Sequence, residues 1–218
     1  AYRKMLVDIN PKDYDYSSLR FCTGGGEALT AKTYLDWKEK FGLELYEGLG
    51  TTEMMFVFIS AAVTKKVKPG FIGSACPGYD VRVINENFER VKPGEVGKLI
   101  VQGPTGTIYW KDNDKQKAAV RDGWCLAGDV VTMDEDGYVQ FLSREDDLIK
   151  SSGYRIGPEE IEEALVMHPS VADAGVVGVP DPVIGQKTKA FVALKPGIKP
   201  SEELKKETLK NLKEGAIL

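Results

Sequence analysis

The densest group of chemically active residue types lies at Leu142–Glu163, which reads LSREDDLIKSSGYRIGPEEIEE. Four charges at Arg144–Asp147 follow a strand-like run, and Lys150–Gly153, expected to be a flexible loop, leads to Tyr154. Ordinary connections between elements are shorter and blander than this one. Loops that combine glycine, charges and an aromatic residue are where binding and catalytic groups concentrate. The stretch is therefore the first candidate for function.

Three earlier stretches could also bring the backbone close to a ligand. Thr23–Glu27 holds three glycines after a strand-like run, and Glu47–Glu53 reads EGLGTTE. Glycine permits a close backbone approach, although a glycine run is equally typical of a plain turn. Gly128–Asp129, expected at the start of a strand, is either a turn or an acid that accepts two hydroxyl hydrogen bonds, as from a ribose. The spacing leaves both interpretations open.

The hydrophobic pattern predicts an α/β framework for the first part of the chain. A strand at Ser18–Cys22, a helix from the Thr30 cap to Phe41 and a strand at Leu43–Tyr46 alternate, and an apolar run follows at Met54–Ile59. In such folds the loops at the carboxyl ends of the strands bind ligands. The glycine-containing stretches follow these strands, so they are expected at the ligand-binding edge.

From Pro69 onwards the pattern changes to alternating or β-branched runs separated by turn signals. These predict antiparallel strands of a small barrel or sheet at Asp80–Ile84, Gly97–Gln102, Val130–Met133 and Tyr138–Ser143. Pro158 then opens an amphipathic helix, and His168, the only histidine, is expected at its end. A small α+β unit is completed by strands at Val171–Val179 and Lys189–Leu194 and by a lysine-rich helix from Ser201 to about Lys213, whose charges are expected to face solvent.

The composition is that of an ordinary globular protein, with 218 residues, of which 42% are hydrophobic and 28% charged. The net charge of −4 and the lack of a basic stripe argue against nucleic acid as a partner. No apolar run approaches the roughly 18 residues of a membrane span, and no export signal is visible. Three widely spaced cysteines, Cys22, Cys76 and Cys125, predict reduced thiols in a cytoplasmic protein. The two ends indicate a piece of a longer protein.

Four motifs in this order resemble the adenylate-forming superfamily, which comprises acyl-CoA synthetases, peptide-synthetase adenylation domains and luciferases. They are GGGEAL at Gly24–Leu29, EGLGTTE at Glu47–Glu53, GWCLAGD at Gly123–Asp129 and REDDLIKSSGYRIGPEEIE at Arg144–Glu162. The resemblance covers essentially the whole chain and is greatest to medium-chain fatty acid or aromatic acid CoA ligases. It implies an α/β part, a small β-barrel subdomain and an α+β C-terminal domain.

In that arrangement, residues 1–145 would belong to the large AMP-binding domain, with an α/β portion at about 1–66 and a barrel-like portion at about 67–145. Residues 146–218 would form part of the small C-terminal domain, hinged at Asp146.

The resemblance implies an ATP-dependent, AMP-forming carboxylic acid–CoA ligase, whose small-molecule partners are ATP, CoA and a carboxylic acid. The acid and ATP give an acyl-adenylate and pyrophosphate, and the CoA thiol then displaces AMP. The nucleotide-binding residues implied are Gly25, Gly26, Glu27, Glu47, Gly48, Leu49, Gly50, Thr51, Thr52, Asp129 and Arg144. Thr52 and Glu53 would be catalytic, with Glu53 a ligand of Mg²⁺. The CoA arm would pass Ser152, Gly153, Tyr154 and Arg155.

Two residues depart from the family pattern, because Leu49 stands where an aromatic residue is usual and Ala127 where threonine is usual. The family's phosphate loop and its last catalytic lysine are not found in the 218 residues, so this piece alone is predicted to be inactive. Two alternatives stay open, namely an adenylation domain that loads a carrier-protein thiol and a non-catalytic nucleotide-binding module. The sequence does not indicate which acid is used, or whether the protein is a monomer or a homodimer.

Overall fold

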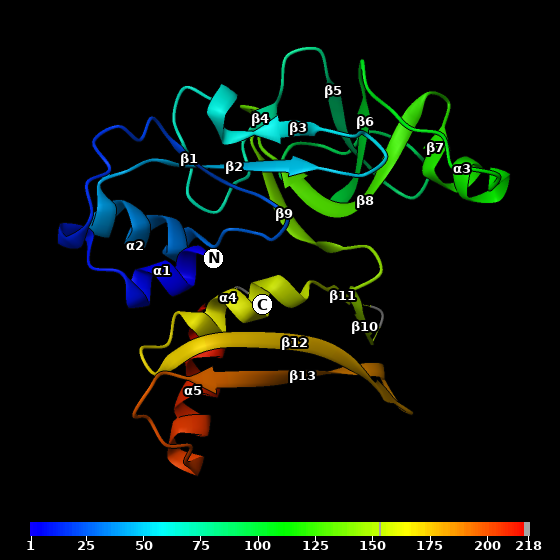
Figure 1. Cartoon of the computed structure of the whole chain (residues 1–218). Coiled ribbons are helices and arrows are strands. Elements are labelled where there is room, and N and C mark those ends of the chain that lie inside the picture. The colour runs from blue at the N-terminus through cyan, green and yellow to red at the C-terminus, as the bar shows by residue number, and fades with distance from the viewer. Residues whose placement is uncertain (153, 216–218) are drawn as a thin grey trace. The chain divides into compact units, whose positions relative to one another are not determined.

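The computed structural model describes residues 1–152 and 154–215. The chain divides into two compact units, residues 1–141 and residues 142–218, and their elements are labelled in Figure 1. The hinge at Asp146 and the domain limits predicted around it stay predictions.

The first sheet of unit 1 is built around a strand–helix–strand crossover. The elements of this part are α1 (Tyr2–Asp8), the 3-10 helix η1 (Pro11–Asp13), β1 (Cys22–Gly24), α2 (Ala31–Phe41), β2 (Leu45–Gly50), β3 (Val57–Ser60), the 3-10 helix η2 (Ala61–Val63) and β4 (Ser74–Ala75). β1 and β2 pair in parallel and are connected by α2, as the alternation predicts. β3 and β4 then extend the sheet with antiparallel pairing.

Both predicted strands of this crossover are shifted in the structure. The strand expected at Ser18–Cys22 begins only at Cys22, and the one expected at Leu43–Tyr46 runs from Leu45 to Gly50. The second strand is longer because residues 48–50 pair with β3. The EGLG part of the second motif is therefore strand rather than loop.

Local signals determine where α2 begins and ends. The Thr30 Oγ1 atom accepts a hydrogen bond from the Thr33 N–H at 3.2 Å, and Gly42 ends the helix with a φ of 69°, which glycine adopts without strain. Trp37 is 3% exposed and stacks on Phe41 with ring centroids 4.2 Å apart. Aromatic and other apolar side chains of α1 and α2 thus pack in one cluster with Cys22 of β1 and Leu45 of β2, on one face of the sheet (Figure 1).

The second sheet of unit 1 is antiparallel, and its strands follow the predicted order. Its elements are β5 (Asp80–Ile84), β6 (Gly97–Gln102), α3 (Asn113–Ala119), β7 (Val120–Arg121), β8 (Trp124–Met133) and β9 (Val139–Arg144), whose last three residues are counted with unit 2. β5 and β6 have the predicted bounds, and the order is β5-β6-β8-β7, with β9 also on β8. The expectation that Gly128–Asp129 starts a strand is wrong, because β8 begins at Trp124 and pairs with β6 from Cys125 onwards.

The two sheets of unit 1 share one hydrophobic core. Phe58 and Ile59 of β3 are fully buried, and so are Val101 of β6 and Val131 of β8. All four belong to one cluster, and burying each such side chain contributes roughly 1.5–3 kcal/mol. This core holds the two sheets, and the motifs on them, in a defined arrangement.

Unit 2 is a four-stranded sheet with two helices, in the order β11-β10-β13-β12. Its elements are β10 (Ile149–Ser151), β11 (Tyr154–Ile156), α4 (Pro158–Val166), β12 (Val171–Asp181), β13 (Gly185–Leu194) and α5 (Glu202–Gly215). The Lys150–Gly153 segment was expected to be a flexible loop, which is wrong for Lys150 and Ser151 because β10 includes them; Gly153 lies outside the described residues. β13 also begins earlier than predicted.

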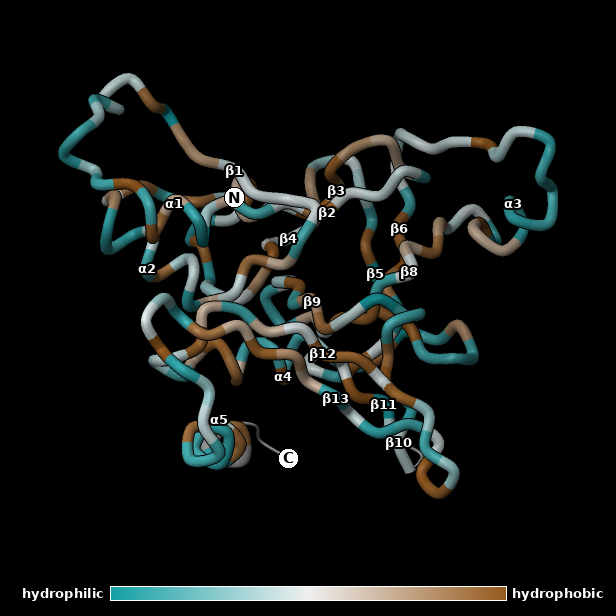
Figure 2. Tube along the Cα trace, turned by 60° about the horizontal axis from the view of Figure 1, so that its bottom comes forward, coloured by the Kyte–Doolittle hydropathy of each residue, from teal (hydrophilic) through white to brown (hydrophobic). Residues whose placement is uncertain are grey.

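Unit 2 has its own core. Ile149 of β10, Leu165 of α4 and Val176 of β12 are buried together, and Leu212 of α5 packs against them. Figure 2 looks along α5 and shows both hydrophobic and hydrophilic residues around it. Lys205, Lys206 and Lys210 are exposed, which confirms a solvated charged face.

His168, just after α4, is 3% exposed, and its Nδ1 accepts a hydrogen bond from the Ser170 N–H at 3.2 Å. The expectation of a helix-end residue is confirmed. Within residues 1–152 and 154–215, none of the helices combines the length and the apolar character that a membrane crossing requires.

Candidate functional site

A buried glutamate joins the first two motifs. The Glu47 side chain on β2 is 7% exposed, and its Oε1 accepts a hydrogen bond from the Leu29 N–H at 2.8 Å. Gly24 of β1 lies opposite Glu47 in the parallel register. The GGGEAL loop is thus attached at both ends to the strand that carries EGLGTTE. Burial raises the pKa of Glu47 to about 7, although the Leu29 hydrogen bond opposes that shift.

Two glycines of these motifs lie against neighbouring backbone, so that a side chain would collide with it at Gly50 and press on it at Gly25. A Cβ on Gly50 would lie 2.5 Å from the Phe56 carbonyl oxygen, and a Cβ on Gly25 would lie 3.1 Å from the Gly48 carbonyl oxygen. The glycines therefore allow the loop after β1 to approach β2 closely, and the chain to turn back sharply after β2.

Glu53 lies in the turn between β2 and β3, beside residues from distant parts of the chain. The Tyr109 hydroxyl donates a hydrogen bond to Glu53 Oε1. Burial, and to a smaller extent the Glu53 charge, raises the pKa of the Cys125 thiol on β8 to about 11. In the same turn, the N–H of Met54 donates to Thr51 Oγ1 at 3.3 Å, whereas the Thr52 side chain is exposed.

Asp129 lies in an irregular part of β8. Its side chain is 2% exposed, and the register between β6 and β8 shifts where β8 passes residues 127–129. Gly128, directly before it, has a φ of 74°. Bulges of this kind redirect side chains and are frequent beside active sites.

The two residues that depart from the family pattern both face the core. Leu49 packs against the same cluster that contains the buried Ala127. The second and third motifs are therefore brought together through hydrophobic contacts in unit 1.

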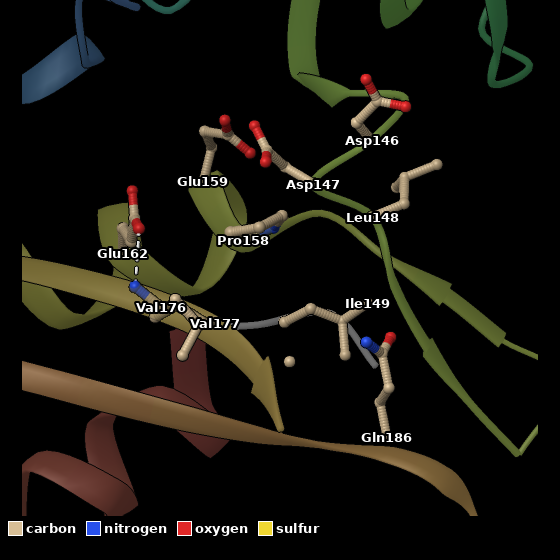
Figure 3. A pocket seen from close by; sticks show the side chains of 11 residues that line it. Asp146, Asp147, Leu148, Ile149, Pro158, Glu159, Glu162, Val176, Val177 and Gln186 are labelled. Atoms are coloured by element: carbon tan, nitrogen blue, oxygen red, sulfur yellow. Dashed lines mark hydrogen bonds between the residues drawn. The ribbon is translucent and has the colours of Figure 1, made fainter. Parts of the chain in front are cut away.

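The fourth motif lies in unit 2 and forms a pocket of about 310 Å³ together with residues of β12 and β13. Arg144 ends β9, and its carbonyl oxygen accepts a hydrogen bond from the Asp147 N–H at 3.1 Å, which closes a turn around the exposed Asp146. Figure 3 shows the acidic side chains of the pocket, with Glu159 and Asp147 close together at the start of α4. The pocket is lined by Asp146, Asp147, Leu148, Ile149, Pro158, Glu159, Glu162, Val176, Val177, Gly178 and Gln186.

Glu159 is a carboxyl group of this pocket with a raised pKa. Burial raises its pKa to about 7, and the nearby carboxylates of Glu162, Asp147 and Glu160 add to the shift. Its neighbour Glu162 instead accepts a hydrogen bond from the Val176 N–H at 2.7 Å, which attaches α4 to β12.

The residues predicted to bind CoA lie on the β10–β11 hairpin. Ser152 has a φ of 48°, and its N–H donates to the Ile184 carbonyl oxygen at 2.9 Å. Tyr154 is 74% exposed, and Arg155 is exposed as well. Gly153, predicted with them, lies outside the described residues. The hairpin is thus anchored beside β13 while its tip presents an aromatic ring to solvent.

Two protein-family models match parts of the chain. Residues 1–110 match the AMP-binding enzyme family, and residues 160–216 match the AMP-binding enzyme C-terminal domain. The chain belongs to the AMP-binding enzyme family. This confirms the resemblance to adenylate-forming enzymes that the motifs indicate.

Several members of the AMP-binding enzyme family are similar over nearly the whole chain. The mitochondrial acyl-coenzyme A synthetase ACSM3 of Mus musculus is 40% identical over 98% of this chain, and the human mitochondrial ACSM5 is 41% identical over 88% of it. The chain covers 38% and 34% of their lengths.

Solved structures of AMP-binding enzymes share the fold. The anthranilate CoA ligase AuaEII in complex with anthranoyl-AMP is 33% identical with a TM-score of 0.89, over 98% of this chain and 42% of that one. A benzoate CoA ligase from Burkholderia xenovorans LB400 is 35% identical with a TM-score of 0.87, over 99% and 43%. The predicted fold class, part of an adenylate-forming enzyme, is confirmed.

In unit 1, the parallel pairing of β1 with β2 joins the first motif to the second, and the shared core joins the second to the third through Leu49 and Ala127; the predicted roles of Gly25–Glu27, Glu47–Glu53 and Asp129 stay predictions. Arg144 and residues 152–155 belong to unit 2, and their predicted roles stay predictions. Sequence reasoning missed Tyr109, which reaches Glu53 across 56 positions of the chain. No spacing pattern could have revealed that contact, because only the folding of unit 1 creates it.

Proposed function

We propose that the full-length protein is an ATP-dependent, AMP-forming carboxylic acid–CoA ligase. The observation that carries the proposal is the attachment of the GGGEAL loop to the EGLGTTE strand through Glu47. The similarity to acyl-coenzyme A synthetases over 98% of the chain supports it. Because the chain spans 38% of that relative's length, the activity is proposed for the longer protein.

Within this function, Gly25–Glu27 and Glu47–Thr52 would form the wall of the nucleotide pocket in unit 1. Asp129 would accept hydrogen bonds from both ribose hydroxyls, which are strong because the acceptor is charged. The Thr52 hydroxyl, exposed in the turn after β2, would donate a hydrogen bond to an oxygen of the α-phosphate. Arg144, the last residue of β9, is proposed to contact the ribose as well.

Glu53 is the proposed protein ligand of Mg²⁺. Among residues 1–152 and 154–215, no group of three histidine, cysteine, aspartate or glutamate side chains could hold a metal ion. Nucleotide enzymes usually bind Mg²⁺ through one or two carboxylates together with the substrate phosphates, and Glu53 would supply one such carboxylate. When bound, the ion would neutralise charge on the transferring phosphoryl group, while Glu53 keeps it oriented.

The second half-reaction would use the fourth motif. Ser152 and Tyr154 on the anchored hairpin would line the path of the CoA thiol arm, and Arg155 would contact CoA phosphates. Asp146, exposed in the turn after β9, is the proposed hinge about which the C-terminal domain turns between the two half-reactions.

The test is a pyrophosphate-release assay on the full-length protein with ATP, Mg²⁺ and short, medium, branched and aromatic acids. We expect release that depends on one class of acid, and an acyl-CoA product when CoA is added. Transfer to a carrier-protein thiol but not to CoA would instead identify an adenylation domain. Nucleotide binding without turnover of any acid would contradict the ligase proposal and favour a non-catalytic module.

We propose that the location of the protein in the cell is either mitochondrial or cytoplasmic. The similar synthetases are named as mitochondrial, whereas the cysteine usage of this chain favours the cytoplasm. Imaging of the tagged full-length protein decides between the two locations.

A further inference from the structure

Tyr109 lies in the irregular segment between β6 and α3 and contacts the turn that carries Glu53. Its hydroxyl donates a hydrogen bond to Glu53 Oε1, and its side chain is half-buried. No motif contains Tyr109, and its neighbours in sequence, Ile108 and Trp110, are exposed. Of these three consecutive large side chains, Tyr109 is thus the one that turns inward.

The position of Tyr109 is held by α3. Its N–H donates to the side-chain Oε1 of Gln116 at 2.9 Å, and the Lys115 ammonium lies 4.6 Å from the centre of its ring. The N–H of Lys115 donates in turn to Asp112 Oδ1 at 2.9 Å, which caps α3. The ring and backbone of Tyr109 thus contact α3 independently of Glu53, and these contacts position the hydroxyl that donates to Glu53.

The backbone on both sides of the contact is strained. Met55, two residues after Glu53, has a φ of 61°, and Lys111, two residues after Tyr109, has a φ of 52°. Residues with side chains rarely adopt this left-handed conformation, and such strain concentrates at functional sites. One strained residue thus follows each partner of the contact by two positions.

We propose that Tyr109 is a positioning residue, which orients the Glu53 carboxylate toward the divalent cation that accompanies ATP. The inference rests on the proposed function, because that function makes Glu53 the ligand. An ionised carboxylate offers about four acceptor positions, so a hydrogen bond from Tyr109 and a metal contact are compatible. Groups that hydrogen-bond metal ligands fix their orientation, and removing them typically lowers metal affinity or activity 10- to 100-fold.

The test measures Mn²⁺ binding to the full-length protein by electron paramagnetic resonance, with a non-hydrolysable ATP analogue present. Tyr109→Phe removes the hydroxyl and keeps the ring beside Lys115. Tyr79→Phe is the matched control, because the Tyr79 hydroxyl bonds to Thr105 of the same segment at 2.8 Å. Glu53→Gln is the reference for loss of the ligand, and the double variant Tyr109→Phe/Glu53→Gln tests whether the two residues act together.

We expect Tyr109→Phe to weaken Mn²⁺ binding about 10-fold and Tyr79→Phe to leave it unchanged. Pyrophosphate release by Tyr109→Phe should need more Mg²⁺ but recover at saturating Mg²⁺. The double variant should bind Mn²⁺ as weakly as Glu53→Gln, with no additional loss.

Three results would contradict this reasoning at different points. If Glu53→Gln weakens Mn²⁺ binding and Tyr109→Phe does not, Tyr109 has no positioning role and the metal assignment stands. If Tyr109→Phe and Tyr79→Phe weaken binding equally, Tyr109 only packs its segment, and the inference is wrong. If Glu53→Gln binds Mn²⁺ like the unaltered protein, the metal assignment in the proposed function is itself wrong.

Discussion

The substitution Glu47→Gln tests whether the buried carboxylate under the GGGEAL loop makes stability depend on pH. Burial raises the pKa of Glu47 from 4.5 to about 7 in the folded protein. Because the folded-state pKa is the higher one, the contribution of this group is fully present below pH 4.5. It is lost as the pH rises through about 7, when the folded state must hold a buried charge.

The size of the effect follows from the shift. One pKa unit corresponds to about 1.4 kcal/mol, so between pH 5 and pH 8 the free energy of unfolding should fall by about 2–3 kcal/mol from this group. Glutamine has nearly the same shape, and its carbonyl oxygen can still accept the hydrogen bond from Leu29. In Glu47→Gln this fall should therefore disappear.

Urea denaturation at a series of pH values between 5 and 8 measures the effect. The control is Glu39→Gln, which removes an exposed glutamate on α2 and should keep the pH dependence of the unaltered protein. If Glu47→Gln loses stability between pH 5 and pH 8 as steeply as the control, the charge on Glu47 is not the cause, and the reasoning fails.

Three further outcomes are expected. In the full-length protein, Asp129→Ala should raise the apparent KM for ATP at least tenfold and leave the KM for the acid unchanged. The reason is that each lost hydrogen bond to a charged acceptor contributes about 1.5–3 kcal/mol. An unchanged KM for ATP would contradict the assignment of Asp129 to the ribose. Asp146→Pro, which restricts φ, should slow thioester formation more than adenylation in single-turnover assays, and equal slowing would contradict the hinge. Burial raises the folded-state pKa of Glu159 to about 7, so this group lowers the free energy of unfolding as the pH rises from 4.5 to 7. In Glu159→Gln the fall in the free energy of unfolding over that range should be about 1–2 kcal/mol smaller. Hydrogen exchange of the α4 amides, measured over this pH range, checks the prediction. If the exchange rates depend on pH equally in the unaltered protein and in Glu159→Gln, Glu159 does not cause the loss of stability.

Features that depend on neighbouring residues could be predicted from the sequence. The helix α2 has the predicted cap at Thr30 and the predicted end at Gly42, because both signals act within one turn of the helix. β5 and β6 also have their predicted bounds, since alternation of side chains over a single strand indicates which face is buried. The order of the four motifs was enough to identify the family.

Features that depend on pairing were predicted less well. β2 extends through Gly48–Gly50 only because β3 lies beside it, and β8 continues through Asp129 because β6 pairs with both of its ends. Lys150 and Ser151, predicted as part of a loop, belong to β10, which pairs with β11 and, through Ser151, with Gly185 far along the chain. In each case the partner strand supplies the hydrogen bonds, and a local sequence pattern does not contain it.

The sequence by itself determined the family, the local helix limits and the residue types of the candidate site. Only the tertiary structure decided their environment. Glu47 has a raised pKa because folding buries it on β2, beside β1 and the end of the GGGEAL loop, and Glu53 has Tyr109 as a partner because the segment before α3 folds back onto the turn. Burial and long-range hydrogen bonds arise when distant segments pack together, so no spacing along the chain encodes them.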